Sequence, residues 1–196
     1  MSQWITFFDE LDRVFRQCAQ LLKDADALLD RRGFTCWHAS ENQVGMQSSG
    51  SIHSPAAWFP RWVVRFYARH DDKDKALGPM AFVSVFLSDE AGRANWKWSP
   101  RQEEPLIVAG VIEGTPGVPI GWSYWSCKWW FWLDGAEVGG HVSTFEPEAR
   151  HKQNWVRMKV FAIPLSAVAS IEDLEARVGK PLEDLLQAAG ASTEPE

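Results

Sequence analysis

A chain of 196 residues with 45% apolar and 23% charged residues has the composition of an ordinary globular domain, which excludes a largely disordered protein. Its formal net charge of −6 argues against a protein whose whole surface binds nucleic acid, although a local basic patch is compatible with that charge. The 3 cysteines are widely spaced, which excludes a dense disulfide framework and suits a reducing compartment.

The first thirty or so residues predict one long amphipathic helix. Apolar residues recur there in heptad steps, in three series: Trp4, Leu11, Cys18 and Ala25; Phe7, Val14, Leu21 and Leu28; Phe8, Phe15, Leu22 and Leu29. We expect this stripe to be buried against a sheet of the same chain, with a dimeric coiled coil as the rival arrangement. Gly33 is expected to end the helix in a left-handed turn. Acidic residues interrupt the apolar segment, so it fits neither a signal peptide nor a membrane span, and we expect a cytoplasmic protein.

The middle of the chain predicts strands. Residues 34–60 have no clear period, and we expect a long loop there or a loop that hides a short strand. Apolar alternation or continuous apolar runs then predict about five main strands, over 61–69, 80–88, 106–112, 122–133 and 155–163. A second long loop is expected over 135–154.

The end of the chain predicts two short helices. The first, 171–178, is capped by Ser170 and ended by Gly179, and the second runs from Pro181 through 189. Residues 190–196 are expected to be a frayed tail. Because parallel strands would need helices between them, a helix followed by strands and then helices predicts one α+β domain over 1–189, with a mainly antiparallel sheet.

Alternation along the strands predicts a sheet face that carries cations and aromatic rings together. If Trp62, Val64 and Phe66 face the long helix, the opposite face carries Arg65, Tyr67, Arg69, Lys128, Trp130, Arg157 and Lys159. Rings stack on bases and guanidinium groups hold phosphate, so these residues are a candidate ligand-binding set. The alternative is that a second layer covers this face and that the cations pair with carboxylates. We expect most of the 12 Trp residues to fill the space between the helix and the sheet.

The two predicted loops supply the remaining candidates for chemistry. His38, His141 and Glu146 could act there as acids, bases or ligands. Cys36 and His38 come nearest to a metal cluster, but no second Cys or His pair accompanies them, so no metal and no cofactor is predicted. We expect all the cysteines to be reduced thiols.

The sequence contains no phosphate-binding loop, no nucleophile elbow and no dinucleotide fingerprint. The leading hypothesis is therefore a non-catalytic intracellular binding protein, of an accessory or inhibitor or immunity-like kind, that acts on a protein partner through its surface. The alternative hypothesis is a nucleotide or nucleic-acid-processing hydrolase that binds a nucleotide or a single strand on the cationic aromatic face. The sequence leaves open whether the protein is an enzyme.

Overall fold

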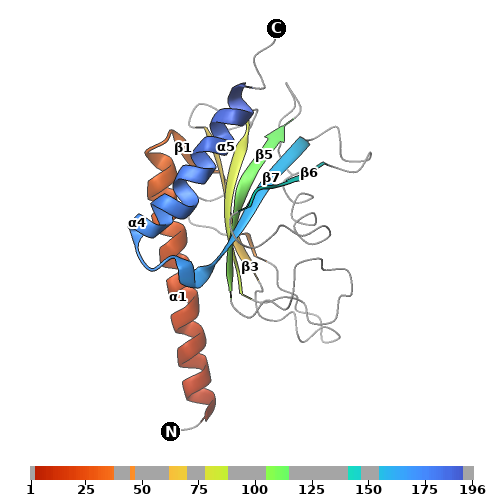
Figure 1. Cartoon of the computed structure of the whole chain (residues 1–196). Helices are drawn as coiled ribbons and strands as arrows, with labels where there is room; N and C mark the ends of the chain where they lie inside the picture. Colours follow the sequence, from red (N-terminus) through yellow and green to blue (C-terminus); the bar gives the residue numbers. More distant parts are fainter. Residues whose placement is uncertain are drawn as a thin grey trace.

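The structure, a computed structural model, describes residues 3–37, 45–46, 62–69, 78–87, 105–114, 141–146 and 155–191. It has the α+β fold that the sequence predicts, with a long N-terminal helix and a C-terminal helical segment on one antiparallel sheet (Figure 1). The elements in chain order are α1 (Gln3–Asp30), β1 (Phe34–Cys36), β2 (Gly45–Met46), β3 (Trp62–Arg69), β4 (Met80–Phe86), β5 (Leu106–Gly114), β6 (Ser143–Phe145), β7 (Trp155–Pro164), the 3₁₀ turn η5 (Leu165–Ala167), α4 (Ile171–Leu174), the π-helical turn η6 (Glu175–Gly179) and α5 (Lys180–Ala191).

The described strands lie in the order β1-β3-β4-β5-β7-β6, and β2 pairs with β3 as well. Every pairing is antiparallel. Four of the predicted strands are confirmed as β3, β4, β5 and β7, whereas the predicted strand 122–133 lies outside the described residues. The short strands β1, β2 and β6 lie in the two segments that were predicted as loops. Runs of two or three residues are too short to show a period of two.

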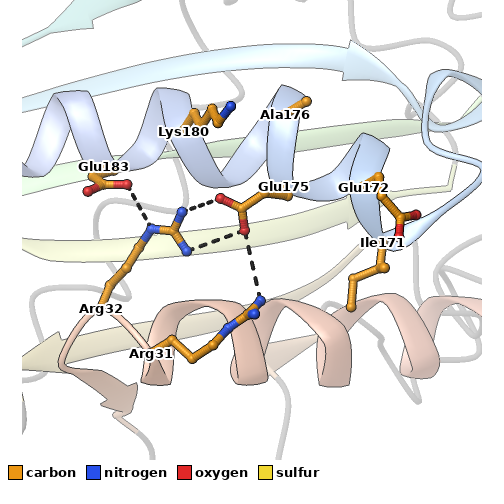
Figure 2. A pocket seen from close by; sticks show the side chains of 8 residues that line it. All are labelled: Arg31, Arg32, Ile171, Glu172, Glu175, Ala176, Lys180 and Glu183. Atoms are coloured by element: carbon orange, nitrogen blue, oxygen red, sulfur yellow. Dashed lines mark hydrogen bonds and ion pairs between the residues drawn. The ribbon is translucent and has the colours of Figure 1, made fainter.

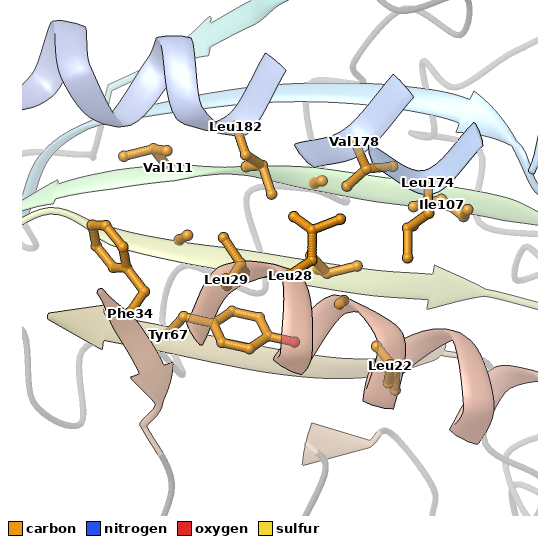
Figure 3. Packing of buried hydrophobic residues seen from close by; sticks show 14 of the residues in the cluster. Leu22, Leu28, Leu29, Phe34, Tyr67, Ile107, Val111, Leu174, Val178 and Leu182 are labelled. Carbon is orange, nitrogen blue, oxygen red and sulfur yellow. The ribbon is translucent and has the colours of Figure 1, made fainter. Parts of the chain in front are cut away.

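The helices share one face of the sheet, and the main core lies between them and the strands (Figure 3). Leu28 and Leu29 of α1 and Val178 and Leu182 of the C-terminal segment pack there on β3, β4, β5 and β7. The opposite face of the sheet is buried as well. Its cluster contains Trp62 and Trp155, so these two residues do not fill the space between helix and sheet, as we expected.

Gly33 forms the left-handed turn after α1 that the sequence predicts. Its φ of 81° lies in the left-handed region, and its N–H donates to the carbonyl of Asp30 at 3.0 Å. The tight turn lets the chain reverse directly into β1, which pairs with the far end of β3. The end of α1 is thereby fixed to the edge of the sheet.

The C-terminal helices are continuous rather than two short helices. Ser170 caps the segment as predicted, since its side chain accepts from the N–H of Asp173 at 3.2 Å. Neither Gly179 nor Pro181 breaks the segment: Gly179 is the last residue of the π-helical turn, in which the hydrogen-bond spacing changes, and Pro181 follows it in α5. Pro181 has no N–H to donate, and a wider turn just before it accommodates this gap. The helix then runs to Ala191, beyond the expected boundary at 189.

The apolar stripe of α1 is buried over only part of its length, which corrects the expectation that the whole stripe is covered. Cys18, Leu22, Ala25, Leu28 and Leu29 are buried in the core. Toward the N-terminus the helix extends beyond the ends of the described strands (Figure 1). The heptad pattern continues there without a partner among the described elements.

No helix in the described part of the chain is long and apolar enough to cross a membrane.

Candidate functional site: the protruding end of α1 and the adjoining groove

The predicted cationic face is the face that the helices cover. The odd-numbered side chains of β3 face the helices, whereas we expected the even-numbered ones to do so. The register pairs Val63 with Val85 and Arg65 with Val83, and paired residues of antiparallel strands share a face. Val83 and Val85 pack under the helices, so Arg65 and Tyr67 do too, while Trp62 and its even-numbered neighbours point away. Alternation predicted the period of β3 correctly but assigned its two faces the wrong way round, because both faces are apolar enough to be buried.

Asp26 of α1 joins two of the predicted ligand-binding residues to the helix. Arg65 donates from Nε to Asp26 Oδ1 at 2.8 Å, and the Tyr67 hydroxyl donates to the same oxygen at 2.9 Å. Desolvation raises the pKa of Asp26, against the lowering effect of the Tyr67 hydrogen bond and the Arg65 charge. Burial, followed by the nearby carboxylate, raises the pKa of Tyr67 well above its ordinary value. The network orients α1 on β3 and uses the guanidinium that a phosphate would need.

Arg157 and Lys159 also lie on the helix-covered face, at one end of the sheet. Lys159 Nζ is 3.0 Å from Glu113 Oε1, and Arg157 Nη1 is 3.7 Å from Glu113 Oε2. Glu113 is buried, so the two cations balance a carboxylate that would otherwise be costly to desolvate. Arg69 is exposed at the end of β3, where its guanidinium lies beside Gly190 of α5. The structure therefore divides the described cations of the predicted set among three places.

The structure describes only some of the other candidates. His38, Lys128 and Trp130 lie outside the described residues. His141 and Glu146 are both exposed and stand at either side of β6. Across the described ranges, no three His, Cys, Asp or Glu side chains gather closely enough to hold a metal ion. Cys18 and Cys36 are free thiols, and burial raises the pKa of Cys18.

Arg32 makes an ionic contact that the sequence did not predict, between the end of α1 and the C-terminal helix (Figure 2). Its Nε donates to Glu183 at 3.0 Å, its Nη2 pairs with Glu175, and its Nη1 donates to the Leu28 carbonyl at 2.9 Å. Burial lowers the pKa of Arg32, but the bonds and charges of the two glutamates outweigh that effect and raise it. These groups line an open depression of about 690 Å³, but they already satisfy one another. We interpret the cluster as a link between the two helices.

The protruding end of α1 has the strongest features of a binding site in the described structure. Ile5, Phe7 and Phe8 are 53%, 46% and 56% exposed, although large apolar side chains are usually buried. Phe7 and Phe8 contact each other edge to face, with ring centroids 5.6 Å apart. A cluster of exposed aromatic and aliphatic side chains on a rigid helix is typical of a surface that another molecule covers.

A groove lies farther along α1, beside residues 17–24, where the chain leaves β7 and enters α4. Its volume is about 700 Å³, and its walls come from α1, from η5 and from the start of α4. Apolar atoms of Leu21, Leu165, Val168 and Ile171 line it, and Ile171 is itself 46% exposed. Asp24 is the charged residue among the lining groups. The groove can accept an apolar side chain from outside.

One row of side chains connects the exposed tip with the groove. Phe7, Val14 and Leu21 recur every seven residues and therefore lie on one side of the helix. Val14 and Leu21 are half-buried against the core, and Leu21 enters the groove wall. At 1.5 Å per residue, the row from Phe7 to Leu21 is about 21 Å long. We call Ile5, Phe7, Phe8, Val14 and Leu21, together with the groove, the α1 surface.

The heptad pattern contained the signal for this surface, but it could not be separated from the signal for the core. A stripe that packs on the chain's own sheet and a stripe that awaits another molecule have the same periodicity. Only the length of the sheet decides which residues are covered. The groove residues of η5 and α4 were not predicted, because they meet α1 only in the folded chain.

Comparisons of the chain with protein-family models, with curated protein sequences and with solved structures find no match.

Proposed function

We propose that this chain is a non-catalytic intracellular binding protein, of an accessory or inhibitor or immunity-like kind, that recognises a protein partner through the α1 surface. The observation that carries the proposal is the exposure of Ile5, Phe7 and Phe8 on a helix end that extends beyond the sheet. Leaving such side chains in water forgoes about 1.5–3 kcal/mol for each one that could be buried. A partner that covers them recovers this free energy on binding.

Three features make the α1 surface suitable for recognition. The second half of α1 is anchored in the core and to Arg65 and Tyr67, so its first half is presented by a fixed base. Aromatic side chains provide a large contact area with few rotatable bonds. The groove beside Leu21 gives a concave site next to the convex helix. Anchors of this kind usually contribute most of the free energy of a protein interface.

The hydrolase alternative has weaker support. Arg65 is bonded to Asp26, and Arg157 and Lys159 are engaged with Glu113. A phosphate would have to displace a carboxylate from either place and enter beneath the helices. The cationic aromatic face remains a prediction, and Lys128 and Trp130 lie outside the described residues.

The proposal is tested by affinity capture of the full chain from its native cells with quantitative mass spectrometry. Phe8→Glu should remove the partner from the captured proteins, because a charge would enter the centre of the interface. Val142→Glu is the matched control, since Val142 is 48% exposed and belongs to a different part of the surface. Equal capture by wild type and Phe8→Glu would refute the proposal.

A further inference from the structure

We draw no further inference here: the strongest candidate, the apolar groove between α1, η5 and the start of α4, belongs to the α1 surface already described, and nothing in the structure shows what covers it.

Discussion

Gly179 of the C-terminal helix lies so close to Leu28 of α1 that a Cβ at position 179 would come within 2.7 Å of Leu28 Cδ2. Leu28 is buried, so its side chain has little room to move. The glycine thus permits the close approach of the two helices that cover the sheet. Its role is packing rather than the helix termination that the sequence predicted.

The contact predicts that the effect of Gly179→Ala depends on Leu28. In the wild-type background, the added methyl overpacks the contact at a cost of about 1–3 kcal/mol, which the better helix propensity of Ala offsets by about 1 kcal/mol. In a Leu28→Ala background the clash is gone, so Gly179→Ala should raise the free energy of unfolding by about 1 kcal/mol. Urea denaturation of the four proteins of this cycle measures the difference. Identical effects of Gly179→Ala in both backgrounds would show that the contact does not matter.

The division of α1 into a buried and an exposed part predicts unequal stability effects at Leu22 and at Phe8. Leu22→Ala should lower the free energy of unfolding by about 2–5 kcal/mol, because it leaves a cavity in the core. Phe8→Ala should change it by less than about 0.5 kcal/mol, because Phe8 is 56% exposed. Chemical denaturation of both variants provides the measurement. A large loss with Phe8→Ala would mean that the tip of the helix is covered within the folded chain.

Tyr67 predicts a loss of stability in alkaline solution. The pKa of Tyr67 is raised in the folded chain, so the folded state keeps its proton while the unfolded state loses it above about pH 10. The contribution is therefore complete below pH 10, and it falls by up to about 1.36 kcal/mol per pH unit above it.

Tyr67→Phe isolates this slope from those of other groups. At pH 8 the variant should be less stable than the wild type, by about 1–3 kcal/mol, because Asp26 loses a hydrogen-bond donor. The gap should narrow between pH 10 and pH 11, since only the wild type has the Tyr67 proton to lose. A constant gap from pH 8 to pH 11 would contradict the assignment.

The contacts of the adjacent residues Arg31 and Arg32 predict that they contribute unequally to the free energy of unfolding. The Arg32 side chain is 17% exposed and contacts two glutamates and a carbonyl, so Arg32→Ala should cost about 1–3 kcal/mol of stability. The Arg31 side chain is 65% exposed and lies 3.9 Å from Glu175, so Arg31→Ala should cost no more than about 0.5 kcal/mol. Thermal denaturation of both variants at one pH compares them. Equal losses would show that the Arg32 contacts do not link the helices.

The sequence predicted the fold class because the strongest patterns in the chain are local. Heptad spacing identified α1, the alternation over 61–69 identified β3, and the apolar run at 106–112 identified β5. Which face of β3 meets α1 could not be predicted, because Trp62 and Val63 are equally apolar neighbours. The pairing of Arg65 with Asp26, 39 residues away in the chain, is set only when the two elements dock.

Only part of the candidate site could be predicted from the sequence, for a similar reason. Phe7, Phe8, Val14 and Leu21 were in the predicted stripe, whereas Ile5 was not, and the exposure of these residues depends on where the sheet ends. The walls of the groove include η5 and α4, which are more than a hundred residues away from α1 in the sequence. Periodicity carries no information about contacts at such separations.

The most direct test of the α1 surface is site-specific photocrosslinking in native cells. The full chain carries the photoreactive residue p-benzoylphenylalanine at position 8 or, as the control, at position 184 of α5, where Asp184 is exposed. Illumination at position 8 should yield one adduct, heavier than the chain by the mass of a partner protein, and illumination at position 184 should not yield it. No adduct at position 8, or the same adduct from both positions, would contradict the proposal that this end of the helix binds a partner.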